Sequence, residues 1–231
     1  MNKTTLILLL LIVASACGVK STQKMINEGD YDEAIAKATD KLRKNKSNKK
    51  SKDYIVLLED AFAKAKERDN RDISNLVRDA NPQNLEQIFN IYKILNARQE
   101  KIRPLLPLKV HNREATFVLE DYSEQIINSK KALSKYLYDN SKALLHTKDK
   151  MNARRAYVDL MYLNELTPGY ADINSLINEA QFKGTDFVHV YTKNETKMVI
   201  PVNLNNALLD FSTYGLNIMK ISRKTYRMIM D

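Results

Sequence analysis

The chain has only one cysteine, Cys17, in 231 residues. A single thiol cannot close an internal disulfide or supply several thiolate ligands to a metal ion. The fold must therefore be stabilised by the packing of apolar side chains. Tryptophan is absent as well, whereas tyrosine is frequent, with twelve residues.

Chain-breaking residues are also scarce, because glycine and proline contribute only five residues each. This scarcity argues against a loop-rich all-β fold. Ala, Leu, Lys, Asn and Glu dominate the middle of the chain, and such a composition favours helix. The sequence therefore predicts a mainly α fold, an antiparallel helical-hairpin solenoid or bundle, followed by a short β-hairpin segment.

Motifs of known chemistry are missing too. The three histidines, His111, His146 and His189, are too far apart for zinc-binding spacings, and no nucleotide-binding glycine pattern occurs. The adjacent acidic pairs Glu59-Asp60 and Glu120-Asp121 would point apart on a helix, so we expect them on solvated faces. We therefore expect no enzyme activity, no metal and no cofactor.

The amino-terminal end has the pattern of a secretory signal. Lys3 supplies a positive charge, residues 6–13 are an unbroken apolar run, and the small residues Ala14-Ser15-Ala16 follow. The apolar run is much shorter than the roughly 20 residues that a membrane-spanning helix needs. No later run is apolar for long enough either, so we expect a soluble body after the signal.

Cys17, directly after these small residues, resembles the cysteine in the lipobox of bacterial lipoproteins. In that family the thiol is diacylated, the peptide bond before it is cut, and the new amino terminus is acylated, for example with palmitate. The resemblance implies a signal peptide over residues 1–16 and a lipidated tether over residues 17–24. An ordinary signal peptide with a chance cysteine and a short uncut anchor remain as alternatives.

Gly18 follows the cysteine, in place of the Asp that retains enteric lipoproteins at the inner membrane. By that resemblance the protein belongs to the outer membrane of the cell envelope and faces the periplasm. Several acyl chains together hold a protein firmly on a bilayer, whereas one chain binds it only marginally.

Apolar residues then recur at three- and four-residue spacing, which is typical of amphipathic helices. The spacing predicts a turn at Gly29-Asp30, breaks at Asn81-Pro82 and at Pro104, and a succession of helices joined by short polar segments. We expect these helices at residues 31–45, 51–66, 72–79, 85–95, 112–146, 149–166 and 170–182.

Two of these segments resemble tetratricopeptide repeats. Gly29, Tyr31, Ala34 and Ala38 match the turn and the small residues of the second repeat helix, and residues 153–180 give a second match. In that second match Ala156, Leu160 and Leu163 lie on the packing face and Pro168 stands at the family's closing proline. The resemblance implies a helical domain over residues 25–183 whose units stack and bind proteins. A non-repeating bundle with Ala at close crossings is the alternative.

The character of the chain changes at Gly184. Residues 186–192 and 196–201 are β-rich runs across a short polar turn, which predicts a β-hairpin, and residues 203–214 predict a short helix. Two interpretations of residues 184–231 stay open. This region is a truncated version of a longer carboxy-terminal domain, or the hairpin packs on the last helices and the basic tail is disordered.

The formal net charge is +9, and the densest basic run is KLRKNKSNKKSK at residues 41–52. We interpret this run as a solvated loop, with contact to anionic lipid or polysaccharide as the alternative. Nucleic acid is not an expected partner. Arg154 and Arg155 beside Tyr157 form the candidate partner surface, because Arg and Tyr favour protein interfaces.

Two hypotheses of function follow from these patterns. The first is a membrane-anchored, non-catalytic lipoprotein whose helical repeats serve as a protein-interaction scaffold in the cell envelope. The second is a glycan- or cell-wall-associated envelope enzyme or remodelling factor. The lack of paired catalytic residues favours the first.

The first prediction concerns Cys17. The substitution Cys17→Ser should abolish acyl labelling and release the protein from membranes, because the thiol is the proposed site of diacylation. Metabolic labelling with a fatty acid and membrane fractionation test this. If mass spectrometry finds Cys17 without acyl groups, following Ala16 in the chain, the lipoprotein interpretation is contradicted.

Overall fold

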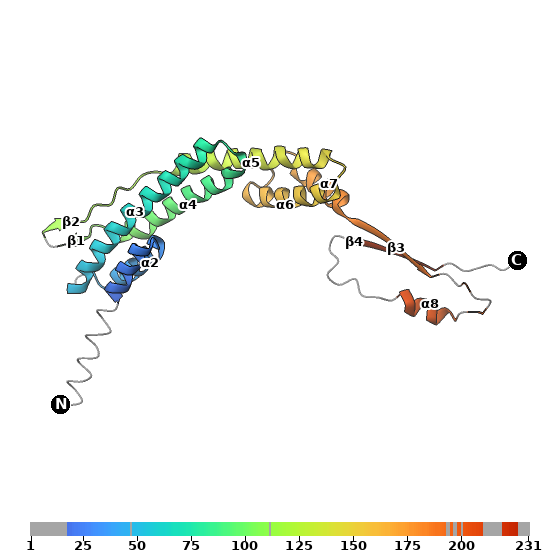
Figure 1. Ribbon diagram of the computed structural model, residues 1–231, viewed down its shortest axis with the longest axis horizontal. Coiled ribbons are helices and arrows are strands. Elements are labelled where there is room, and N and C mark those ends of the chain that lie inside the picture. Colours follow the sequence, from blue (N-terminus) through green and yellow to red (C-terminus); the bar gives the residue numbers. More distant parts are fainter. Residues whose placement is uncertain are drawn as a thin grey trace, which may run out of the picture. The chain divides into compact units, whose positions relative to one another are not determined.

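The computed structural model describes residues 18–46, 48–110, 112–192, 195, 198–199, 201–209 and 219–225. The chain divides into two compact units, residues 1–133 and residues 134–231. Both units are built mainly from helices, and a small antiparallel two-stranded sheet is present in the first unit (Figure 1). The mainly α fold predicted from composition and periodicity is therefore confirmed.

Residues 18–28 are helical and are followed by α2 (Tyr31–Lys44). Gly29 lies between them with φ of 87°, a backbone conformation that glycine adopts without the steric cost of a Cβ atom. The turn predicted at Gly29-Asp30 is thus confirmed. Ala34 and Ala38 of α2 are fully buried, in line with their predicted position at close helix crossings.

The segment predicted as a tether, residues 17–24, is helical from residue 18 onward. Thr22 is fully buried and its hydroxyl donates a hydrogen bond of 3.0 Å to the carbonyl of Gly18. Val19 packs against the core of the first unit. The small polar residues that suggested a flexible spacer are therefore part of the packed helical body.

The next helix, α3 (Lys49–Asp79), is continuous over 31 residues, so the two helices predicted at residues 51–66 and 72–79 are one. The stretch between them, residues 67–71, is rich in charged residues. Within that stretch Asp69 is buried, and Ile73 just after it is buried as well, so the helix keeps an inward face. After the 3₁₀ turn η1 (Pro82–Asn84), α4 (Leu85–Ile102) returns and ends in the 3₁₀ turn η2 (Arg103–Leu105).

The long helix predicted at residues 112–146 begins later than expected. The strands β1 (Lys109–Val110) and β2 (Arg113–Glu114) form the antiparallel pair, and residues 115–122 are extended. We call this extended stretch, residues 115–122, the strap. It runs beside α3 before α5 (Ser123–His146) begins (Figure 1). Residues 115, 117 and 119 of the strap point inward and alternate with exposed residues, which is strand rather than helix periodicity.

The second unit contains the rest of α5 and the packed pair α6 (Lys150–Leu166) and α7 (Ile173–Gly184). The Asp149 carboxylate accepts a hydrogen bond of 2.8 Å from the Met151 amide and caps α6. The inward residues of α6 are Ala153, Ala156, Leu160 and Leu163. The packing face predicted for this helix is therefore confirmed.

The strand predicted at residues 186–192 is β3 (Asp186–Thr192), but its partner differs from the predicted one. It pairs in parallel with β4 (Met219–Thr225), which lies in the basic tail. Residues 198, 199 and 201 of the expected second arm are outside any strand, and the other residues of that arm lie outside the described residues. The helix α8 (Val202–Leu209) accounts for the first part of the helix predicted at 203–214.

The burial of Ala156 leads to the second prediction. The substitution Ala156→Leu should lower the free energy of unfolding by about 1–3 kcal/mol, because three extra carbons must enter a fully buried site. Thermal unfolding followed by circular dichroism measures the effect. The control is Ala143→Leu on the exposed side of α5, which should leave the midpoint nearly unchanged. Equal midpoints for both variants would contradict a close helix crossing at Ala156.

Candidate functional site

A buried arginine joins three helices of the first unit. Arg98 of α4 is only 3% exposed. Its guanidinium donates two hydrogen bonds to Asp32 of α2, at 2.9 and 3.1 Å, and one of 2.7 Å to Asp69 of α3. Because a planar guanidinium presents several donors at fixed angles, one side chain can hold two carboxylates at once. We call Arg98, Asp32 and Asp69 the arginine clamp.

A second arginine extends this network toward the surface. Arg68 contacts Asp69 through Nε at 3.0 Å and Asp32 at 3.3 Å, and its guanidinium lies 5.4 Å from the ring centre of Tyr31. Partial burial alone would raise the pKa of Asp32, but the hydrogen bonds and charges of Arg98 and Arg68 outweigh it and lower that pKa. Asp32 therefore stays ionised, which suits a structural anion better than a proton donor.

The strap is fixed by side chains of α3 and α4 that bind its backbone. The Glu59 carboxylate accepts a hydrogen bond of 2.8 Å from the Thr116 amide, and the Lys66 ammonium donates one of 3.0 Å to the Val118 carbonyl. Gln99 is almost fully buried. Its amide pairs with both backbone groups of Glu120, at 2.6 and 2.8 Å.

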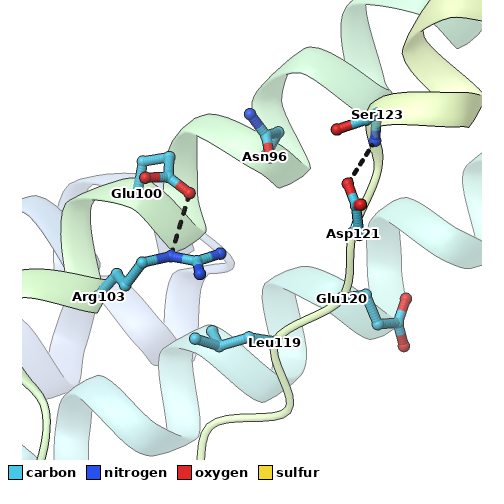
Figure 2. Close-up of a pocket in the computed structure, with 7 residues that line it drawn as sticks. All are labelled: Asn96, Glu100, Arg103, Leu119, Glu120, Asp121 and Ser123. Carbon is cyan, nitrogen blue, oxygen red and sulfur yellow. Dashed lines mark hydrogen bonds and ion pairs between the residues drawn. The ribbon is translucent and has the colours of Figure 1, made fainter.

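An open cleft of about 570 Å³ lies where the strap meets α4 and the start of α5 (Figure 2). Each of its charged groups already has a partner. Glu100 and Arg103 form an ion pair of 3.2 Å, and the Asp121 carboxylate accepts a hydrogen bond of 2.9 Å from the Ser123 amide. The remaining lining residues are Asn96, Leu119 and Glu120.

The acidic groups around the strap are held in their ionised form. Hydrogen bonds from Ser123 lower the pKa of Asp121, and a hydrogen bond from Lys66 lowers the pKa of Glu120. A hydrogen bond from Arg113 likewise lowers the pKa of Glu59. A general acid near neutral pH needs a raised carboxyl pKa instead. These side chains therefore suit recognition and structural roles.

The sequence predicts Glu59 and Glu120 on solvated faces; Glu120 is exposed and Glu59 is partly buried, but both side chains bind specific partners. Glu59 binds Arg113 and the strap backbone, and Glu120 forms an ion pair of 2.7 Å with Lys66. Their partners are more than fifty residues away in the sequence, so no local pattern could have identified them.

The predicted partner surface lies on α6 in the second unit. Arg154 and Arg155 line a shallow depression of about 290 Å³ together with Met151, Val158 and Asp159, whereas Tyr157 is partly buried and does not line it. Arg154 has a structural role as well. It donates a hydrogen bond of 2.8 Å to the Gly184 carbonyl at the end of α7 and forms an ion pair with Asp186 of β3.

Exposed apolar side chains lie on the three elements that these contacts of Arg154 join, and the sequence patterns did not identify them as a group. Phe182 and Phe187 are 65% and 57% exposed, although their ring centres lie only 5.5 Å apart. On α6, Met151 and Val158 are 55% and 64% exposed. We call Met151, Arg155, Val158, Phe182 and Phe187 the α6–β3 surface.

Other predicted positions give less information. Cys17 and His111 lie outside the described residues, and His146 is exposed at the end of α5. His189 lies in β3. Within the part of the chain that the structure describes, no group of three or more His, Cys, Asp or Glu residues could hold a metal ion. In that same part, no helix is both long and apolar enough to cross a membrane.

The chain was also compared with known proteins. No family model matches it, and neither the curated proteins nor the solved structures include a significant match.

The third prediction concerns the arginine clamp. The substitution Arg98→Met should lower the free energy of unfolding by about 3–5 kcal/mol, because the buried Asp69 carboxylate loses one of its two guanidinium partners and Asp32 loses both hydrogen bonds from Arg98. Urea denaturation measures this loss. A second substitution, Asp69→Leu, on the Arg98→Met background should restore part of the stability, because it removes a buried carboxylate that only the partly exposed Arg68 would still pair.

The matched control is Arg103→Met near the end of the same helix. Its ion pair with Glu100 is more than half exposed on both sides, so the loss should stay below about 1 kcal/mol. Similar losses for Arg98→Met and Arg103→Met would show that the clamp does not hold the three helices together.

Proposed function

We propose that the protein is a membrane-anchored, non-catalytic lipoprotein that serves as a protein-interaction scaffold in the cell envelope. Its anchor is the acylated Cys17, and its destination is the outer membrane on the periplasmic side. The observation that carries the interaction role is the α6–β3 surface, where α6, α7 and β3 expose four large apolar side chains and an Arg154–Asp186 ion pair joins α6 to β3.

The anchor is supported by the order of features at the amino-terminal end. A charged residue, an apolar run and small residues precede Cys17. Cleavage before Cys17 would keep every residue of the described helical body. Cys17 is bonded directly to Gly18, which is helical.

The interaction role is supported by the chemistry of the α6–β3 surface. Isolated exposed apolar residues are common on proteins, but contiguous apolar groups often mark binding sites. Aromatic residues and arginine are enriched at interfaces and contribute most of the binding energy where they become buried. Phe182 and Phe187 contact each other at the end of α7 and the start of β3, and Arg155 is exposed on α6.

The arrangement of Arg154 adds a reason for rigidity at this place. The stem of Arg154 lies so close to Gly184 that a Cβ atom there would come within 3.0 Å of its Cγ atom. Asp186 is held by both Lys150 and Arg154. Because the junction of α6, α7 and β3 is fixed by these contacts, the apolar groups around it lose little freedom on binding.

The fourth prediction tests the docking role in cells. A photo-crosslinking amino acid at Val158 should yield one crosslinked protein species, because the side chain is exposed beside Arg155. The same amino acid at Val77 of α3, which is similarly exposed, is the matched control and should yield none. Serine at both Phe182 and Phe187 should reduce the Val158 crosslink about tenfold or more.

The folding of the serine variant is checked by thermal unfolding, since both rings are exposed and their loss should change stability little. A Val158 crosslink that persists in this variant would contradict docking through the α6–β3 surface. Hydrolysis of cell-wall material by the purified protein would contradict the non-catalytic proposal itself.

A further inference from the structure

The first described residue lies against the beginning of α3. A Cβ atom at Gly18 would come within 2.5 Å of the Tyr54 hydroxyl, so a side chain at this position would have to displace the end of the Tyr54 side chain. Helical side chains tilt toward the amino-terminal end of their helix, so the Tyr54 hydroxyl lies level with the turn before it. Gly18 is thereby placed beside the first turns of α3.

A second contact fixes the same arrangement. The Lys37 ammonium of α2 donates a hydrogen bond of 2.8 Å to the Ser21 hydroxyl, and Ser21 lies in the helix that begins the described chain. Residues 18–28 and α2 are consecutive helices joined by the tight turn at Gly29. The start of the first helix therefore lies beside the end of α2. Gly18 therefore lies near the end of α2 as well.

The basic run at residues 41–52, which we call the basic loop, covers this same end of the first unit. It consists of the last turn of α2, the connection to α3 and the first turn of α3. Lys49 precedes Tyr54 by five residues, or about 7.5 Å along the helix axis. Cys17 is bonded to Gly18, and neighbouring Cα atoms are about 3.8 Å apart.

The basic loop is ordered by its own contacts. The Asn48 side chain accepts a hydrogen bond of 2.7 Å from the Ser51 amide and caps α3, and the Ser51 hydroxyl donates one of 2.6 Å to the Asn45 carbonyl. The Lys46 ammonium donates a hydrogen bond of 2.9 Å to the Leu105 carbonyl in η2. The loop is therefore a preformed surface.

The charges of this surface are of one sign. Residues 41–52 contain seven Lys or Arg residues and no carboxylate. Asp40 and Asp53 flank the run, and a carboxylate oxygen of Asp40 lies 3.7 Å from a guanidinium nitrogen of Arg43. Among the residues that the structure describes, no ion pair holds any lysine of the basic loop, and each of these lysines is exposed.

We infer that the basic loop binds the anionic headgroups of the bilayer that holds the lipid anchor, so that the first unit lies with this end on the membrane. The inference rests on the proposed anchor at Cys17. Clusters of four to eight Lys or Arg next to a membrane attachment point bind anionic lipid, and the attraction declines within a Debye length of roughly 8 Å at physiological salt. Gly18, to which the proposed anchor residue is bonded, lies beside the first turns of α3, at the same end of the first unit as the basic loop.

The fifth prediction is tested with the purified acylated protein in two kinds of vesicle, phosphatidylcholine alone and phosphatidylcholine mixed with phosphatidylglycerol. An amine-reactive acetylating reagent labels exposed lysines, and mass spectrometry measures the rate at each site. On anionic vesicles at low salt the basic loop should react about fivefold more slowly than on neutral ones. Lys93 on the exposed face of α4 is the internal reference, and high salt should abolish the difference.

A charge variant tests whether the loop itself makes the contact. Glutamine at Lys49, Lys50 and Lys52 should remove the protection of Lys41 and Lys44 on anionic vesicles. The matched control carries Lys64→Gln, Lys130→Gln and Lys131→Gln, and Lys41 and Lys44 should stay protected in it. Melting curves of both variants confirm folding, since all six lysines are at least partly exposed.

The possible failures are distinguishable. Acyl chains bind both vesicles, so a protein that floats with neither would overturn the anchor and the inference together. Flotation with both vesicles and equal acetylation rates of the loop lysines on each would overturn the inference and leave the anchor in place, because the contact would then not depend on headgroup charge.

Discussion

The buried guanidinium of Arg98 is the interaction on which the first unit depends. It holds carboxylates from α2 and α3 while its own helix is α4, so a single side chain fixes three helices. Removing one partner of a buried ion pair is costly, because the remaining charge has lost its water and its counter-charge. The next residue, Gln99, forms hydrogen bonds with both the backbone N–H and the backbone C=O of Glu120 in the strap. Two adjacent side chains of α4 therefore position the helices and the extended segment.

The strap shows how polar side chains can replace a missing strand partner. Its backbone groups have no neighbouring strand, and unpaired backbone groups are costly when they lose water. Glu59, Lys66 and Gln99 supply the partners from helix surfaces, while the inward face of the strap packs apolar residues such as Phe117, whose ring centre lies 5.6 Å from that of Phe62. The carboxylates recruited for this purpose are held ionised, and the cleft beside them has the features of a structural site.

The proposed function uses the two units differently. In the first unit the described chain begins at Gly18, against the end that carries the basic loop, so anchoring and membrane contact would act at one place. In the second unit large apolar side chains surround the junction of α6, α7 and β3, which Arg154 and Asp186 hold together. Membrane attachment and protein docking would thus be separate tasks of separate units.

The sequence by itself determined the helical class, the turn at Gly29 and the inward faces of α2 and α6, because helix periodicity is a local property that neighbouring residues decide. It also predicts a secretory signal before Cys17, in residues that lie outside the described part of the chain. Only the tertiary structure decided that α3 is continuous, that residues 115–122 form a strap and that β3 pairs with β4. Each of these depends on partners far away along the chain. Arg98 and Asp32 are 66 residues apart, and before folding they cannot be told from solvated charges.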